Sequence, residues 1–261
     1  MRGARQFVVK TDMQSFPVSS ANGRSSSMPV FVARPDDDLA RPLVIVCPEI
    51  FGVNEPIRRV ASRIAALGYL AVAPSFVHRL SGKLEFPIDA QGREIGLNLF
   101  FQLTRNHVTE DARAILNQFG AARAAIVGFS AGAHIAFYLA TRLPIAATAA
   151  FYPGWLGGTD IALSRPRPTL SLASSIAKQR GRLLLFFGGA DHIIIERDRI
   201  AVARALTAAG VEHEIVTYPD APHGFFFEGR ESYRAAAAED ACDRLRELLA
   251  ERLPAPSVPP H

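Results

Sequence analysis

Gly128-Phe129-Ser130-Ala131-Gly132 stands between the apolar run 124–127 and an alanine-rich stretch at 133–142. The run predicts a buried strand, and the stretch after it predicts a helix. A serine between two glycines at a strand-to-helix turn is the nucleophile-elbow pattern, in which the sharp turn exposes the hydroxyl and the glycines allow close packing. The five residues alone also fit a helix that starts with small residues, so the flanking elements decide the interpretation. We expect Ser130 to be a nucleophile.

The rest of the chain repeats this alternation of apolar runs and helical patterns. Residues 43–47 form a continuous apolar run, as strands do when helices cover both faces of a sheet. Asn54 can cap the helix that follows, and Gly68 can end it. The alternation predicts an α/β fold, with a mostly parallel central sheet and helices on both faces. Further strands are predicted at 69–73, 146–152, 183–187 and 213–218, and further helices at 109–119, 196–209 and 233–252.

The two ends of the chain and one insertion bear on domain organisation. Residues 6–12 and 28–34 flank a Ser/Gly-rich turn and predict an antiparallel hairpin at the start of the sheet. The longest insertion between strands, 153–181, is shorter than the roughly 50 residues of an independent domain. We therefore expect one domain over 1–261 without a separate lid, and a fairly open active site. Residues 1–5 and the proline-rich 254–261 are predicted to be disordered.

Composition excludes several classes of function. The net charge is +4, but the 29 basic residues are scattered, so no nucleic-acid partner is expected. No stretch approaches the roughly 18 apolar residues of a membrane span, and no apolar segment follows the basic start, so a cytoplasmic protein without a membrane partner is expected. Cys47 and Cys242 are too few for a disulfide framework and are interpreted as buried thiols. No metal-ligand spacing and no nucleotide-binding glycine motif is present, so no metal and no cofactor are expected.

A serine hydroxyl needs a base, and in this arrangement the chain order is serine, acid, histidine. Two histidines after Ser130 lie in suitable loops, namely His192 after one strand and His223 after the last strand. The position after the last strand favours His223, although a histidine between proline and glycine also suits an ordinary turn. His134 follows Ser130 by one helical turn and is interpreted as a packed or rim residue, because its side chain would point away from the hydroxyl.

The acid is expected at the carboxyl end of another buried strand. Asp191 directly follows the run 183–190, at the edge where catalytic groups gather in open α/β sheets. A turn after two glycines would also explain an aspartate there. Asp198 and Glu196 are the fallback candidates, on what looks like the exposed face of the next helix. The predicted triad is Ser130, His223 and Asp191.

Four segments of this chain resemble the dienelactone hydrolase family. They are Pro48-Glu-Ile-Phe-Gly-Val-Asn54, the elbow itself, Gly188-Gly-Ala-Asp191 and His223-Gly-Phe225. The resemblance covers nearly the whole chain, and the first segment is far more specific than the elbow pattern. It implies a compact α/β-hydrolase fold without a lid and the triad chosen above. It also implies an oxyanion hole made by the backbone N–H groups of Ile50 and Ala131.

Two departures from the family pattern bear on chemistry. The best-known members have cysteine at the Ser130 position and a glutamate at the Glu49 position that engages the thiolate. An alcohol is many pK units harder to ionise than a thiol, so His223 is expected to act as a general base. Glu49 is then expected only to hydrogen-bond or to set the local charge, and it could equally be a buried, partnered loop carboxylate.

The second departure concerns substrate binding. Family members that hydrolyse dienelactone are expected to hold its carboxylate with two arginines. Arg93 matches the first position, but Phe227 stands at the second, shortly after the histidine. Replacing an arginine by a phenylalanine removes charge-assisted hydrogen bonds and favours apolar groups. Substrate contacts are assigned to Arg93, Phe51 and Phe227, with neutral substrates preferred.

These observations favour an enzyme that cleaves a small carboxylic ester or lactone through an acyl-enzyme on Ser130. Two alternatives use the same scaffold. A serine peptidase that acts on short peptides would need the same triad, and a non-catalytic receptor for small molecules would need only the fold. An intact triad argues against the receptor.

Overall fold

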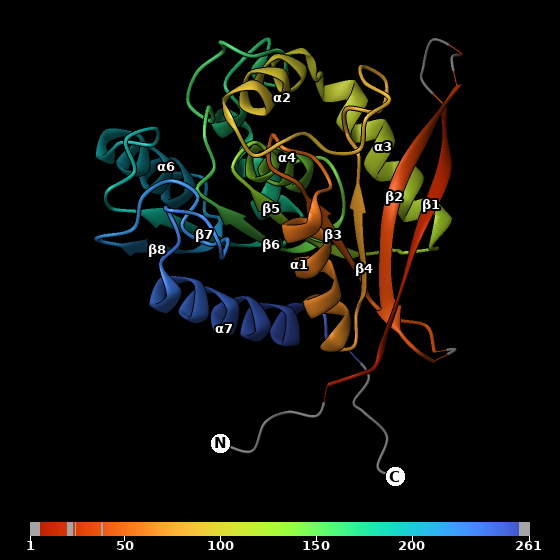
Figure 1. Ribbon diagram of the computed structural model, residues 1–261. Helices are drawn as coiled ribbons and strands as arrows, with labels where there is room; N and C mark the ends of the chain where they lie inside the picture. Colours follow the sequence, from red (N-terminus) through yellow and green to blue (C-terminus); the bar gives the residue numbers. More distant parts are fainter. Residues whose placement is uncertain (1–5, 20–22, 24, 38, 256–261) are drawn as a thin grey trace.

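The central sheet determines the position of every residue discussed above. The structure is a computed structural model, and it describes residues 6–19, 23, 25–37 and 39–255. Eight strands form one sheet in the order β1-β2-β4-β3-β5-β6-β7-β8 (Figure 1). The strands are β1 (Val9–Ser19), β2 (Ser25–Pro35), β3 (Leu43–Cys47), β4 (Leu70–Pro74), β5 (Ala124–Phe129), β6 (Ile145–Phe151), β7 (Arg182–Gly188) and β8 (Glu212–Tyr218).

Pairing in the sheet confirms the predicted α/β architecture. β1 and β2 form an antiparallel hairpin, and β2 pairs antiparallel with β4. All the strands from β4 to β8 along the sheet pair in parallel. Both hairpin strands are longer than the predicted segments 6–12 and 28–34, which missed the extended residues near the turn. The carboxyl ends of β3, β5, β6 and β7 therefore share one edge, where catalytic loops collect.

Helices cover the sheet on both sides, with α7 on one side of the strands and α4 and α6 on the other (Figure 1). α1 begins where Asn54 accepts a hydrogen bond from the N–H of Ile57 at 3.2 Å, as the N-cap prediction required. The helices are α1 (Glu55–Ala66), α2 (Ala90–Gln102), α3 (Arg105–Gln118), α4 (Ala131–Ala140), α5 (Ser174–Lys178), α6 (Glu196–Ala208) and α7 (Ala235–Arg252).

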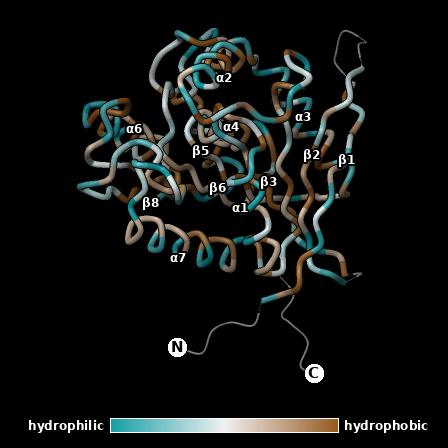
Figure 2. The backbone as a smooth tube through the Cα atoms, viewed as in Figure 1, coloured by the Kyte–Doolittle hydropathy of each residue, from teal (hydrophilic) through white to brown (hydrophobic). Residues whose placement is uncertain are grey.

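The inner strands form the core of the molecule. Every residue of β3, β5 and β6 is buried, as expected for strands covered on both faces. The edge strand β8 is only half-buried. Hydropathy coloured along the backbone shows apolar residues concentrated on the central strands, while α6 and the outer turns are more polar (Figure 2).

Helix α2 was not predicted, and α3 begins four residues earlier than the predicted 109–119. α2 contains Gly92 and Gly96, which lower helix propensity and obscured the helical pattern. Gly96 is required by packing, because a Cβ there would lie 2.1 Å from the carbonyl oxygen of Ile50. Thr104 caps α3 and accepts a hydrogen bond from the N–H of His107 at 3.3 Å.

The insertion 153–181 contains two short 3-10 turns and α5, and it forms no lid domain. The predictions of disorder over 1–5 and over 256–261 fall outside the described residues. Residues 254 and 255, for which disorder was also predicted, are described, and Ala255 packs against the core.

Candidate active site

Ser130 occupies a strained turn between β5 and α4. Its backbone has φ 51° and ψ −113°, in a region that residues other than glycine rarely adopt. The two flanking glycines make this turn possible, because a Cβ on Gly128 would lie 2.3 Å from the carbonyl oxygen of Gly132. A Cβ on Gly132 would lie 2.2 Å from the carbonyl oxygen of Cys47. The absence of a side chain at Gly132 therefore allows α4 to pack closely against the loop after β3, where Ile50 lies.

The structure brings the three predicted triad residues together. Ser130 Oγ lies 2.9 Å from His223 Nε2, and His223 Nδ1 lies 2.8 Å from Asp191 Oδ2. With the ring proton on Nδ1 donated to the carboxylate, Nε2 is free to accept the hydroxyl proton. The other carboxylate oxygen accepts hydrogen bonds from the N–H groups of Ile193 and Ile194, at 2.8 and 3.0 Å.

The surroundings of Asp191 favour its charged form. Burial alone would raise the pKa of this carboxyl, but the hydrogen bond from His223 and the two backbone N–H groups outweigh burial and lower it. A negative charge at Asp191 fixes the imidazole tautomer. Ser130 is 7 % exposed and the His223 side chain is 17 % exposed, so both reacting groups are largely shielded from solvent.

The alternative acids and bases lie elsewhere. His192 is exposed, and Glu196 and Asp198 belong to the first turn of α6. His134 is fully buried in α4, where Nδ1 donates to the carbonyl oxygen of Gly154 at 2.9 Å and Nε2 accepts from Thr169 at 2.8 Å. Burial lowers the pKa of His134 to about 4, so it is a neutral packed residue.

The two amides expected to form the oxyanion hole lie on neighbouring segments. Ala131 is the first residue of α4, and its N–H points out of a helix N-terminus, where the helix dipole favours negative charge. Ile50 lies in the loop after β3, which Gly132 approaches closely. Neither N–H donates a hydrogen bond within the described part of the chain. A small cavity of about 30 Å³ borders both residues and is otherwise mostly apolar.

Glu49 forms a buried ion pair that sequence reasoning missed. Arg230 Nη1 donates to Glu49 Oε2 at 3.0 Å, and Nη2 donates to Oε1, which makes the contact bidentate. Burial opposes the charge of Arg230, but Glu49 outweighs it and raises the pKa of the guanidinium. The interpretation of Glu49 as a partnered loop carboxylate fits this contact. A cation three positions after Phe227 is the signal that could have indicated it.

The three predicted substrate-contact residues lie in different surroundings. Phe227 is buried, and its ring lies 4.8 Å below the guanidinium of Arg230, which also lies 5.5 Å from the half-buried ring of Phe51. Phe227 therefore packs against the cation of Arg230. Arg93 is exposed on the first turn of α2, and no described contact connects it to the triad.

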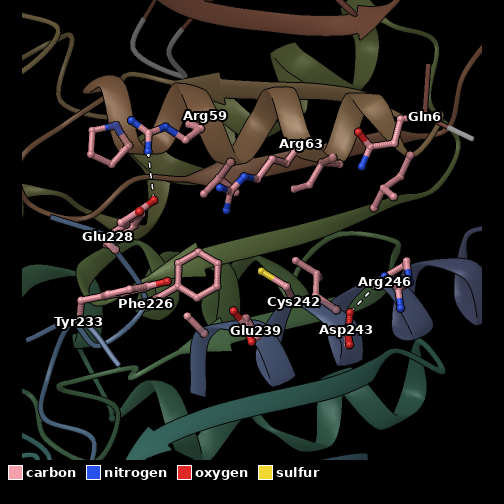
Figure 3. A pocket seen from close by; sticks show the side chains of 17 residues that line it. Gln6, Arg59, Arg63, Phe226, Glu228, Tyr233, Glu239, Cys242, Asp243 and Arg246 are labelled. Atoms are coloured by element: carbon pink, nitrogen blue, oxygen red, sulfur yellow. Dashed lines mark ion pairs between the residues drawn. The ribbon is translucent and has the colours of Figure 1, made fainter. Parts of the chain in front are cut away.

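A groove in the described part of the chain lies apart from this chemistry. It has a volume of about 670 Å³ and runs between α1 and α7, with Arg59 and Glu228 bridging one end (Figure 3). Phe227 lines it, but none of the triad residues does.

Within the described residues, no group of three or more metal-binding side chains is placed to hold an ion. No helix in that part of the chain is long and apolar enough to cross a membrane.

The fold and the elbow define the class of protein: an eight-stranded sheet with Ser130 at its carboxyl edge is an α/β-hydrolase. The sequence profile described as "Dienelactone hydrolase family" matches residues 28–253, so the chain belongs to that family and is a hydrolase of this kind.

Individual relatives agree with this assignment. Proteins named "Putative carboxymethylenebutenolidase" from Synechocystis sp. and Escherichia coli K12 are 36 % and 33 % identical over 223 and 235 residues. The matches cover 81 % and 88 % of this chain, and 87 % and 84 % of the relatives. A crystal structure titled "Putative Dienelactone Hydrolase" from Klebsiella pneumoniae superimposes with a TM-score of 0.82 at 28 % identity, and covers 94 % of this chain and 99 % of that one.

Proposed function

We propose that this protein hydrolyses small carboxylic esters or lactones through an acyl-enzyme on Ser130. The observation that carries the proposal is the continuous hydrogen-bonded path from Ser130 through His223 to Asp191, with 2.9 and 2.8 Å contacts. Membership of the dienelactone hydrolase family supports the same substrate class.

The geometry suggests the order of events. His223 Nε2 takes the hydroxyl proton as Ser130 Oγ attacks the acyl carbon, and Asp191 stabilises the imidazolium that forms. The N–H groups of Ile50 and Ala131 donate hydrogen bonds that stabilise the negative charge developing on the carbonyl oxygen. His223 then gives its proton to the leaving alkoxide. Water activated by the same imidazole attacks the acyl carbon and releases the acid.

The cavity beside the two amides is mostly apolar, which favours an apolar acyl group. The cation of Arg230 is already neutralised by Glu49, so a substrate carboxylate finds no free positive charge there. Both features favour small neutral esters or lactones.

A panel of p-nitrophenyl esters of graded acyl length tests the proposal. We expect kcat/KM to be highest for acetyl or propionyl esters and to fall as the acyl chain lengthens. Ser130→Ala is expected to abolish turnover while the protein remains folded. Hydrolysis of short peptides in preference to all esters would favour a peptidase, and binding without any turnover would favour a receptor.

A further inference from the structure

Tyr152 is a strained and buried residue whose side chain the proposed chemistry does not use. It directly follows β6 and has φ 43°, in the left-handed region that non-glycine residues avoid. It is fully buried. Ser130, at the end of the neighbouring strand β5, has nearly the same φ of 51°. Backbone strain of this kind persists only where the surrounding structure enforces it.

One peptide group ties Tyr152 to the nucleophile. The carbonyl oxygen of Phe151 accepts a hydrogen bond from the N–H of Ser130 at 2.9 Å. The N–H of Tyr152, in the same peptide group, donates to the carbonyl oxygen of Phe186 on β7 at 2.7 Å. The peptide between β6 and Tyr152 thus bridges the nucleophile turn and the strand that carries the acid. Its orientation also sets the direction in which the tyrosine ring leaves the backbone.

The ring packs against the catalytic base. The centroids of the Tyr152 and His223 rings lie 4.8 Å apart with an angle of 60° between the ring planes. The tyrosine ring also packs against the ring of Phe225, with 5.4 Å between the centroids and 72° between the ring planes. The hydrogen bonds of His223 to Ser130 and Asp191 hold its two ring nitrogen atoms. The packed tyrosine ring restricts the remaining movement of the imidazole and so helps to keep both hydrogen bonds aligned.

The hydroxyl of Tyr152 has no hydrogen-bond partner among the described residues. Burial, with the charge of Glu49 as the next cause, raises the pKa of this phenol well above its ordinary value, so it stays protonated. Since the hydroxyl holds no contact in the site, the packing of the ring is the feature that acts on the triad.

From these contacts we infer that Tyr152 is a positioning residue, whose ring holds the imidazole of His223 in line with Ser130 Oγ. The inference rests on the proposed function, because it assigns His223 as the base. Loss of the ring should slow the chemical step and leave substrate binding nearly unchanged.

Steady-state kinetics on p-nitrophenyl acetate with four variants test this role. Tyr152→Leu is expected to lower kcat by about tenfold to a hundredfold, since small displacements of reacting groups have effects of this size. KM is expected to stay within about threefold. Tyr152→Phe keeps the ring and is expected to restore kcat to within about threefold of the wild type. Tyr152→Asn removes the ring but tolerates the left-handed backbone, so it decides the matter if the leucine variant does not fold.

Phe16→Leu is the matched control, because Phe16 is a buried ring on β1 that contacts Phe119 and no residue of the triad. It should lose stability and keep its kcat. A folded Tyr152→Leu or Tyr152→Asn variant with wild-type kcat would overturn the inference, as would a Tyr152→Phe variant as slow as the leucine variant. Turnover by Ser130→Ala would instead overturn the proposed function, so the two failures are distinguishable.

Discussion

Asp191 uses its two oxygen atoms for different purposes. One oxygen accepts a hydrogen bond from Nδ1–H of His223, and the other accepts hydrogen bonds from the N–H groups of Ile193 and Ile194 in the loop after β7. A single carboxylate therefore orients the base and fixes its own position. This geometry separates the roles of charge and of loop structure, because an amide can preserve the second contact without supplying the first.

Asp191→Asn is expected to lower kcat by about a thousandfold or more, since the amide neither fixes the imidazole tautomer nor stabilises the imidazolium. Residual activity should exceed that of Ser130→Ala, which removes the nucleophile itself. The measurement is kcat on p-nitrophenyl acetate, with the far-ultraviolet spectrum as a check on folding. A drop below tenfold would point to Glu196 or Asp198 as the orienting acid.

Glu49 and Arg230 form a pair in which each charge depends on the other. Glu49→Gln should destabilise the protein by about 3 kcal/mol, because it leaves the guanidinium buried without its counter-charge. The same variant should raise the ratio of kcat/KM for an ester that carries a free carboxylate to that for its neutral analogue. Urea unfolding and this ratio are the two measurements.

The double variant Glu49→Gln with Arg230→Gln is the control for that pair. This double variant should be more stable than Glu49→Gln alone. It should also lack the increased preference for a carboxylate-bearing ester that is expected of Glu49→Gln. An unchanged substrate ratio in Glu49→Gln would show that the cation of Arg230 does not reach the substrate.

At the scale of elements, α4 supports the segment 153–169 through a buried histidine. His134 binds the carbonyl oxygen of Gly154 and the hydroxyl of Thr169, and both contacts require the neutral ring. The pKa of His134 is lowered to about 4 from 6.5 by burial. Below pH 6.5 His134 becomes protonated in the unfolded chain but stays neutral in the folded protein. Stability is therefore complete above pH 6.5 and is lost as the pH falls towards 4.

The free energy of unfolding should fall by about 3 kcal/mol through His134 over that range, from roughly 1.4 kcal/mol per pK unit. Urea unfolding at several pH values between 7 and 4 measures it. His134→Gln should show a shallower dependence on pH than the wild type. His192→Gln, which alters an exposed histidine, should keep the wild-type slope. Parallel curves for all three proteins would contradict this role of His134.

Elements with strong local signals could be predicted from the sequence, and α2 could not. The buried strands, the hairpin and the capped helix α1 follow from apolar runs, a turn and Asn54. Helix α2 contains Gly92 and Gly96, whose low helix propensity argues against a helix. The reason for Gly96 lies in the tertiary structure, where the helix backbone approaches the carbonyl oxygen of Ile50. Local patterns do not contain that information.

At the scale of the whole molecule, the three residues could be predicted because they follow the strands β5, β7 and β8, and parallel strands bring their carboxyl ends to one edge. The Glu49–Arg230 pair was missed, since it joins residues 181 positions apart and Arg230 follows no strand. The packing of Phe227 was missed for the same reason. Its ring packs against a cation that only the folded chain places there.

We propose that Ser130 carries an acyl group during turnover. Intact-protein mass spectrometry, after brief mixing with a p-nitrophenyl ester at low pH to slow deacylation, followed by peptide mapping, tests it most directly. We predict that the protein gains the mass of one acyl group and that this group lies on the peptide that contains Ser130. The added mass should be absent from Ser130→Ala and greatly reduced in His223→Ala. An acyl group on another residue, or undiminished turnover by Ser130→Ala, would show that Ser130 is not the nucleophile.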